Sequence, residues 1–325
     1  MSDGMSRGTG TMPPIAWRVL RSPALYSYVA AAVVWGVTVA LGADGAALLA
    51  TALSFSAFAV LAALGQMLVI TLGPGNIDLS IPSVIALASA LAMLVMDGGD
   101  AAIPLGLLAA VGAGMTVGVF NVALIRLLRI PPIIATLSSG LVVLSTAISF
   151  GRGLKVKPPP GFAGFTAARV LGVPLLAVLA VAVMAVAALL LARTVAGRTL
   201  SAAGQNARAA EFAGLPVRRV RLLAYVLCSG LAGLTGALLA GFSGGNSLDQ
   251  GEEYLLLTIA VVVIGGTDVG GGRASVAGLG GAAMFMFLLV AMLNASGAGP
   301  GLRLLLTGLI IVGVITVAGA PKISR

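Results

Sequence analysis

The stretch GRTLSAAGQNARAAEFAGLPVRRVR, from Gly197 to Arg221, is the one long polar segment in an otherwise apolar chain. A charged side chain at the centre of a bilayer costs about 2.5–3.5 kcal/mol on insertion scales, so a segment with five arginines must leave the membrane. Lys and Arg accumulate in the cytoplasmic loops of membrane proteins. The stretch therefore predicts a cytoplasmic segment with membrane-embedded parts on either side of it.

The composition of the whole chain supports a protein surrounded by lipid. Of the 325 residues, 59% are hydrophobic and only 9% are charged, whereas soluble domains carry about 25% charged residues. The net charge of +9 then indicates membrane orientation rather than nucleic-acid binding, because no basic patch is interleaved with stacking aromatics. We expect an all-α integral membrane protein that contacts membrane lipid and binds no nucleic acid.

Several chemistries are excluded by the residues that the sequence lacks. It has no histidine and one cysteine, Cys228, which excludes a Ser-His-Asp relay, a histidine metal site and a disulfide within the chain. None of its three lysines precedes Ser or Thr, so the phosphate-binding loop of ATPases is missing. We expect no catalytic residue, no metal site and no cofactor on this chain, and ATP and Mg to be bound by a separate subunit.

About ten apolar runs approach the ~20 residues that a helix needs to cross the hydrocarbon core. Basic residues fall unequally on the two sides if the amino terminus is cytoplasmic, with fourteen inside and five outside. This asymmetry predicts both termini in the cytoplasm. The predicted spans are 24–42, 48–72, 77–96, 101–127, 132–150, 172–193, 220–241, 253–270, 274–296 and 301–319.

The spans define one transmembrane domain, 23–320, between two cytoplasmic tails, 1–22 and 321–325. A signal peptide is the alternative for the first tail and span, but the apolar run after it exceeds the usual 7–15 residues. The predicted connections are a cytoplasmic loop, 194–219, and two extracytoplasmic loops, 151–171 and 242–252.

The first interruption of an apolar run is TLGPGNIDLSIPS, Thr71 to Ser83. Irregular backbone at membrane depth needs surrounding protein or a water-filled cavity, so Asn76, Asp78 and Ser80 are candidates for a pathway or gate. In the alternative, Asp78 caps the next helix and faces cytoplasmic water. The charge-based topology favours this alternative for Asp78, because it places the residue near the inner face.

The second interruption is VVVIGGTDVGGGRASVAG, Val261 to Gly278. It repeats the order of the first: an apolar run, glycines, an aspartate and a serine before a new helix. Two such breaks are consistent with an internal duplication, as in many transporters. Its candidate pathway or gating residues are Gly265, Gly266, Thr267 and Asp268.

Four motifs, in the same order, resemble the permease subunits of ribose/xylose-type ABC importers. GNIDLSIPSVIALASALAM is similar to that family's GGIDLSVGS-type motif, and IPPIIATL to its IPPFIATL segment. AAGQNARAAEFAGLPV resembles its cytoplasmic loop, AIGGNPEAARLSGIPV, and VVIGGTDVGGGRASVAG resembles VLGGTSLAGGRGSVLG. The four motifs cover residues 71–278.

The resemblance implies a multi-pass protein of the bacterial inner membrane that carries a sugar or sugar-like solute. Its implied partners are a cytoplasmic ABC ATPase, an extracytoplasmic solute-binding protein and a second permease copy, as a homodimer or a paralogous heterodimer. The chain departs from the family at Pro82 and Leu144, which leaves the solute open. The family's Glu-then-Arg pair in the cytoplasmic loop is inverted here to Arg208 and Glu211.

We predict that a short helix near Ala207–Ala213 is the element that the ATPase moves. Gly204 and Gly214-Leu215-Pro216 would bound it, since glycine ends helices and proline cannot extend them. The predicted ATPase-coupling residues are Gly204, Asn206, Arg208, Ala209, Ala210, Glu211, Gly214, Leu215 and Pro216.

Two other classes of membrane protein fit the sequence less well, and the first is kept as the alternative. An ion-coupled secondary transporter needs ionisable residues within the membrane, and apart from Asp78 and Asp268 the spans have almost none. A membrane enzyme needs clustered acids or a nucleophile with a base, which the sequence lacks.

Overall fold

The computed structural model describes residues 23–313, apart from 98, 298, 300, 303–304, 307 and 310–311. In this part the fold is helical, as predicted, and the strands are limited to the two-residue pair β1 (Arg169–Val170) and β2 (Val173–Pro174). The helices of the first half are α2 (Pro23–Ala40), α3 (Gly45–Thr71), α4 (Ile81–Met96), η1 (Asp100–Ala102), α5 (Ile103–Leu127) and α6 (Pro132–Gly151). Those of the second half are α7 (Pro160–Ala167), α8 (Leu175–Arg193), α9 (Val195–Phe212), α10 (Val217–Ser243), η2 (Leu248–Gly251), α11 (Tyr254–Ile264) and α12 (Val276–Ala295).

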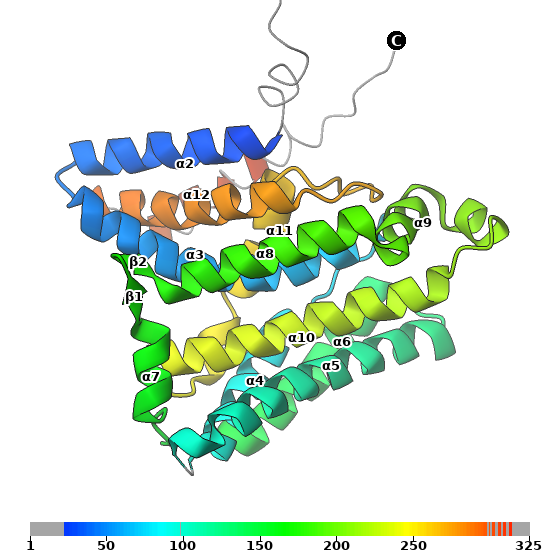
Figure 1. Cartoon of the computed structure of the whole chain (residues 1–325), viewed down its shortest axis with the longest axis horizontal. Helices are drawn as coiled ribbons and strands as arrows, with labels where there is room; N and C mark the ends of the chain where they lie inside the picture. The colour runs from blue at the N-terminus through cyan, green and yellow to red at the C-terminus, as the bar shows by residue number, and fades with distance from the viewer. Residues whose placement is uncertain are drawn as a thin grey trace, which may run out of the picture.

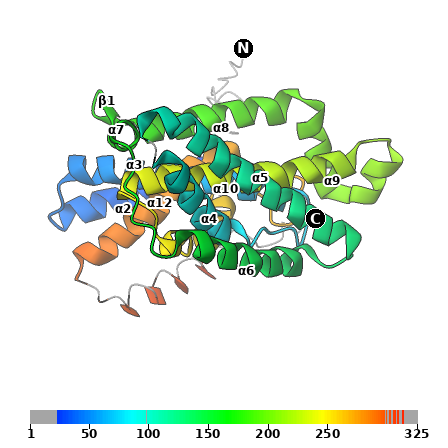
Figure 2. The ribbon, with the colours of Figure 1, turned by 90° about the horizontal axis from the view of Figure 1, so that it is seen from below.

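The long helices lie side by side, with α3 and α10 at the centre of the bundle (Figures 1 and 2). Six helices of the described part are long and apolar enough to cross a membrane: α3, α5 with η1, α6, α8, α10 and α12. The apolar parts of α2 and α4 are shorter than these six. The prediction of an all-helical membrane protein is therefore confirmed, although the number of ten spans is not.

Small residues let α10 approach its neighbours closely. A Cβ atom at Gly233 would overlap the carbonyl of Ala110 in α5, and one at Gly236 would overlap the carbonyl of Ile85 in α4. Close backbone approach through small residues is how helices pack in membranes, where the hydrophobic effect does not hold them together. These contacts fix α10 against α4 and α5.

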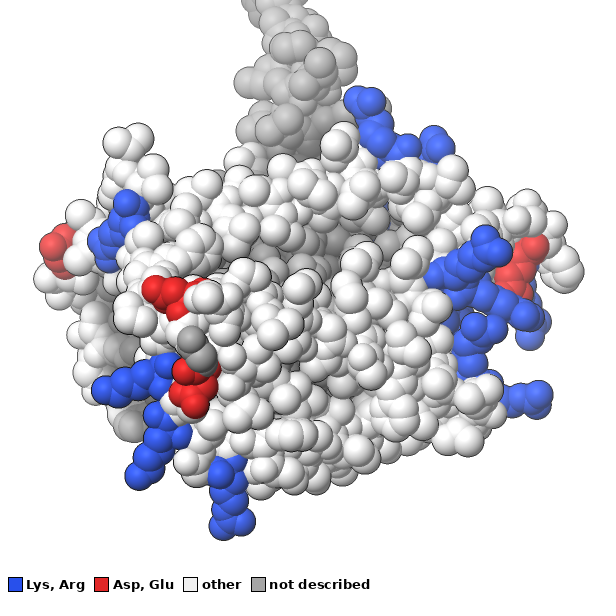
Figure 3. Space-filling view, turned by 60° about the horizontal axis from the view of Figure 1, so that its bottom comes forward, with Lys and Arg blue, Asp and Glu red and all other residues white. Residues whose placement is uncertain are grey.

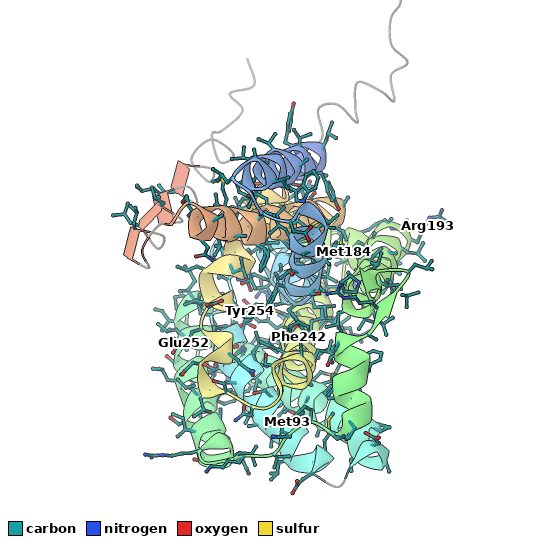
Figure 4. The ribbon with its side chains drawn as sticks, turned by 90° about the vertical axis from the view of Figure 1, so that its left-hand side faces the viewer. Met93, Met184, Arg193, Phe242, Glu252 and Tyr254 are labelled. Atoms are coloured by element: carbon teal, nitrogen blue, oxygen red, sulfur yellow. The ribbon has the colours of Figure 1, made fainter. Side chains whose placement is uncertain are left out.

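An aromatic cluster joins three helices at the end of the bundle that faces the viewer in Figure 4. The ring of Phe242 in α10 lies edge-on to Phe55 and Phe58 in α3, with centroid distances of 5.5 and 5.4 Å. Phe55 in turn stacks on Phe287 of α12 at 5.2 Å. Ring pairs of this geometry contribute about 0.5–1.5 kcal/mol each beyond the area that they bury.

Several predicted boundaries were wrong. α11 ends at Ile264, and the chain from Gly265 to Ser275 is not helical, whereas a span over 253–270 was predicted. α4 begins at Ile81 rather than at 77. The predicted loop 194–219 is mostly helical. The predicted tails lie outside the described residues, as does much of the predicted span 301–319.

The predicted extracytoplasmic loops contain some regular structure. Loop 151–171 includes α7, whose first turn is held by the N–H of Gly161 donating to Asp100 Oδ1 at 2.8 Å. Loop 242–252 begins with the last turn of α10, which ends where Gly244 adopts φ +82. Ser89 of α4 then donates to the side chain of Asn246 at 2.5 Å, so this connection is tied to the bundle.

The two ends of the bundle differ in charge. Figure 3 shows basic side chains gathered at the end where α9 lies, and both signs mixed at the opposite end. By their positions in the helices and loops, the described basic residues at the α9 end are Arg126, Arg129, Arg193, Arg198, Arg208, Arg218, Arg219, Arg221 and Arg273. The opposite end has Arg152, Lys155, Lys157 and Arg169 together with Asp44, Asp97, Asp100, Asp249, Glu252 and Glu253.

Candidate functional site

The polar stretch that opened the sequence forms two helical pieces joined at a kink. Within α9 the backbone of Asn206 is extended, with φ −160° and ψ 101°. The side chain of Asn206 accepts the N–H of Ala209 at 3.0 Å, which caps the second piece, residues 207–212. The short helix predicted near Ala207–Ala213 is therefore present, but it begins after Asn206 and not after Gly204.

The end of this short helix is closed by a Schellman motif. Gly214 has φ +77°, the left-handed conformation that glycine adopts without steric cost. The N–H of Leu215 donates to the carbonyl of Ala210, and that of Gly214 to Glu211, both at 3.0 Å. These are the two hydrogen bonds that define the motif. Pro216 follows as the residue before α10.

The short helix projects from the bundle and exposes most of its surface (Figure 1). Ala210 is its buried contact, packed with Ala203 and Val217, while Arg208, Ala209 and Glu211 are exposed. The side chain of Phe212 is 92% exposed. Phe212 was not among the predicted site residues, although an aromatic residue in an alanine- and arginine-rich segment was a usable signal.

Gly204 lies where α9 meets both glycine-rich breaks. A Cβ atom at Gly204 would overlap the carbonyl of Thr71 and the backbone N of Gly272, and one at Gly271 would overlap the backbone of Gly73. The N–H of Gly272 also donates to the carbonyl of Thr71 at 2.9 Å. We call this meeting of residues 71–73, 204 and 271–272 the glycine junction. It joins three segments that are far apart in the sequence.

The first break turns back into the bundle after the glycine junction. Asp78 lies beside Ser229 of α10, which is about 18 Å along that helix from Val217 at 1.5 Å per residue. The segment is held there by side chains from neighbouring helices. The N–H of Asp78 donates to Gln66 at 3.3 Å, and that of Leu79 donates to Thr136 at 3.0 Å.

The carboxylate of Asp78 is 1% exposed, which corrects the interpretation that it faces cytoplasmic water. Its Oδ1 accepts from the N–H and the hydroxyl of Ser80 at 2.9 and 2.6 Å, and its Oδ2 accepts from Ser229 at 3.3 Å. Asn121 of α5 donates to the hydroxyl of Ser80 at 2.9 Å and is itself hydrogen-bonded to Ser139 of α6. We call these five side chains the Asp78 network. It ties the first break to α5, α6 and α10.

Asn76 lies nearer the glycine junction than the network does. Its side chain donates to the carbonyl of Gly73 and accepts from the hydroxyl of Tyr225 at 3.3 Å. Asn76, like Gln66 and Thr136, therefore gives the irregular backbone of the first break a protein partner, which such backbone needs within a membrane.

The second break, residues 265–275, is held mainly by its own residues. Ser275 donates through its hydroxyl to the carbonyl of Gly265 at 2.6 Å and through its N–H to Thr267 at 3.1 Å. Thr267 is buried, but Asp268 is exposed and accepts the N–H of Gly270. Asp268 is therefore not a structural counterpart of the buried Asp78. Gly265 also lies in backbone contact with Gly278 of α12, and Gly266 has φ +89°.

The predicted site residues thus form two groups that meet at the glycine junction. One group presents the short helix 207–212 to the outside of the bundle. The other group lies in the two breaks, where Asp78, Ser80 and Thr267 are buried and Asp268 is exposed. Gly204, two residues before the kink at Asn206, is in contact with both breaks.

Comparison with known proteins identifies the class of this chain. Residues 48–315 match the family model described as "Branched-chain amino acid transport system / permease component", and the chain belongs to this family. It is a multi-pass permease of the bacterial inner membrane, the translocation subunit of an ABC importer, and not an enzyme.

Relatives that it matches are named for the import of ribose, fructose and autoinducer 2. The ribose import permease protein of Bacillus subtilis is 32% identical over 73% of this chain and 74% of its own length. The fructose import permease protein of Bifidobacterium longum is 30% identical over 85% and 78%. An autoinducer 2 import system permease protein of Yersinia enterocolitica is 28% identical over 74% and 75%. No solved structure matches.

Proposed function

We propose that this permease carries a sugar or sugar-like solute that an extracytoplasmic binding protein delivers. A cytoplasmic ATPase, which binds ATP and Mg, drives it through the short helix 207–212. The observation that carries the coupling role is that this helix projects from the bundle with Phe212 exposed and is joined through Gly204 to both breaks.

The proposed motion begins when ATP binding brings the two ATPases together. The short helix is capped at both ends, by Asn206 and by Gly214, so it moves as a rigid unit. Gly204 then shifts against the backbone of Thr71 and Gly272, and the two breaks follow. We propose that Asn76, Asp78, Ser80 and residues 265–268 control the gate in this way.

The proposed transporter has ten spans, with both termini in the cytoplasm, and works with a second permease copy, identical or paralogous. The concentration of arginines at the α9 end supports this orientation. α6 exposes Ile134, Leu137 and Leu141 along one face, which fits lipid or the second copy. The similar order of residues in the two breaks supports a duplication, although their aspartates differ in burial.

Because Phe212 is exposed, a substitution there tests the coupling role directly. Phe212→Ala removes a side chain that makes no core contact, so the permease should fold normally and lose affinity for the ATPase. A buried aromatic anchor at an interface contributes about 2 kcal/mol or more. Co-purification of the ATPase from membranes measures the loss of affinity. The control is Phe150→Ala, in the last turn of α6 at the opposite end of the bundle from Phe212. Unchanged co-purification would contradict docking at this helix.

The solute is tested through the extracytoplasmic binding protein that we propose as the partner of this permease. Its thermal unfolding is measured with a panel of pentoses, hexoses, sugar alcohols, autoinducer 2 and branched-chain amino acids. The proposal expects the unfolding temperature to rise with a sugar or sugar alcohol. Uptake into proteoliposomes containing permease, ATPase and binding protein then confirms the solute. Stabilisation by branched-chain amino acids alone would overturn the sugar assignment.

A further inference from the structure

A cavity of about 340 Å³ lies between the carboxyl end of α5 and the amino end of α10. Its lining contains three arginines and one acid, so the lining has a net charge of +2. We call this cavity the arginine groove. The residues that line it are Ile125, Arg126, Glu211, Val217, Arg218 and Arg221.

The arginines of the groove have no counter-charge of their own. Within the part of the chain that the structure describes, none of the three forms an ion pair with Glu211 or with another acid. α10 has no acid in its first turn, although the amino end of a helix disfavours positive charge. The Nε of Arg221 is also buried without a hydrogen-bond partner, whereas buried polar groups are nearly always paired. The missing complement of the groove is therefore a negatively charged acceptor.

The groove adjoins the helix at which we propose that the ATPase docks. Glu211 belongs to the short helix 207–212 and also lines the groove. A second cavity, of about 570 Å³, is lined by Glu211 and residues 214–219, and it shares Val217 and Arg218 with the groove. An ATPase docked on the short helix therefore lies beside the groove.

A carboxylate carried by the ATPase suits the groove better than a lipid or a free anion does. The apolar lining is limited to Ile125 and Val217, which are 9% and 2% exposed, so the groove offers little surface to an acyl chain. Arg126 and Arg218 are exposed, so a free anion exchanges with solvent. A carboxylate on a docked partner is instead held at a high effective concentration, and it can accept two N–H groups from one guanidinium.

We propose that an Asp or Glu side chain of the ATPase enters the arginine groove and pairs with Arg218 and Arg221, beside Arg126. This inference rests on the proposed docking at the short helix and adds a second, electrostatic contact to it. The contact joins the ATPase to α10 itself. Arg221 lies one turn before Tyr225, whose hydroxyl donates to Asn76 of the first break, so this contact also lies close to that break.

The test titrates the ATPase that co-purifies with this permease against the full-length permease, in detergent without added lipid, and measures the Kd. Each of Arg126→Gln, Arg218→Gln and Arg221→Gln should weaken binding about two- to fivefold, as for charge pairs open to solvent. Added NaCl should weaken binding of the unchanged permease and have less effect on a variant that lacks all three arginines. Arg218→Lys keeps the charge and should keep most of the affinity.

The matched control is Arg193→Gln, which removes the same charge at the same end of the bundle. Arg193 does not line the groove, and its side chain points away from the bundle (Figure 4). Arg193→Gln should therefore bind the ATPase normally. An equal loss of affinity in this variant would overturn the proposal, because only the total charge of this end would then matter.

Two further results would overturn the proposal. In the first, the groove variants bind the ATPase as the unchanged permease does; if Phe212→Ala still weakens binding, docking at the short helix stands without the groove, and if it does not, both proposals fail. In the second, the groove variants keep the ATPase but lose phosphatidylglycerol, counted by native mass spectrometry, which indicates a lipid site.

Discussion

Asp78 is a buried acid whose hydrogen bonds come from uncharged groups. Ser80 and Ser229 donate to its carboxylate, which stabilises the break through hydrogen bonding. Asp78→Asn keeps one oxygen for Ser80 and places an amide beside Ser229, so we expect a small change in the unfolding temperature. Asp78→Ala orphans the donors of Ser80, at a cost of about 1–3 kcal/mol for each buried group.

Thermal unfolding of the purified permease compares the two Asp78 variants. Asp268→Asn and Asp268→Ala serve as controls, because Asp268 is exposed at the other break and neither change should matter. An Asp78→Asn variant as unstable as Asp78→Ala would show that the charge itself is required.

Gly204 has no room for even one methyl group. We expect Gly204→Ala to separate α9 from Thr71 and Gly272, because the added Cβ overlaps backbone atoms that cannot rotate away. Overpacking of this kind costs about 1–3 kcal/mol. Gly112→Ala in α5 meets nothing within 4 Å and is the control. Unfolding temperature and solute uptake measure the effect, and normal values for both would contradict the glycine junction.

Gly214 closes the carboxyl end of the short helix, where the chain turns toward α10. Gly214→Val places a β-branched residue at φ +77°, which costs at least about 1–2 kcal/mol and disturbs the Schellman motif. We expect ATP hydrolysis to continue in reconstituted proteoliposomes while solute uptake falls.

The control for this prediction lies at the other end of the bundle. Gly42 has φ +100° and nothing within 4 Å of its Cβ position, so Gly42→Val introduces comparable strain far from the ATPase. Equal loss of uptake in both variants would assign the effect to general instability and not to coupling.

The short helix could be predicted because its signals are local. Gly214-Leu215-Pro216 ends a helix in any context, and the polar composition excludes membrane burial. Gly204 was misassigned as a boundary, because its role depends on two segments that lie more than 65 residues away in the chain. The capping role of Asn206 was also missed, because the start of the short helix was assigned to Gly204.

For the whole molecule, the long helices could be predicted from the lengths of the apolar runs. The depth of Asp78 in the bundle could not be predicted, because a topology based on the positions of basic residues treats each break as a turn at the surface. α3 continues to Thr71 and the chain then doubles back, which places Asp78 within the bundle. Only contacts such as the one with Ser229 reveal this depth.

The orientation of the molecule can be tested with two exposed side chains at opposite ends. Phe212 is 92% exposed and Leu171 is 99% exposed, while the natural thiol, Cys228, is buried. In a Cys228→Ser background, Leu171→Cys should react with a membrane-impermeant maleimide in spheroplasts. Phe212→Cys should react only after lysis. The reverse pattern would place the short helix outside the cell and exclude ATPase docking there.

In the glycine junction, main-chain atoms of three segments are in direct contact. Side chains in contact can change rotamer and so absorb a small displacement. Main-chain atoms in contact have no rotamers and cannot absorb a displacement in this way. If the short helix moves, even a sub-ångström shift at Gly204 must reach both breaks or separate the surfaces altogether, which favours a transporter with two discrete states over one that opens gradually.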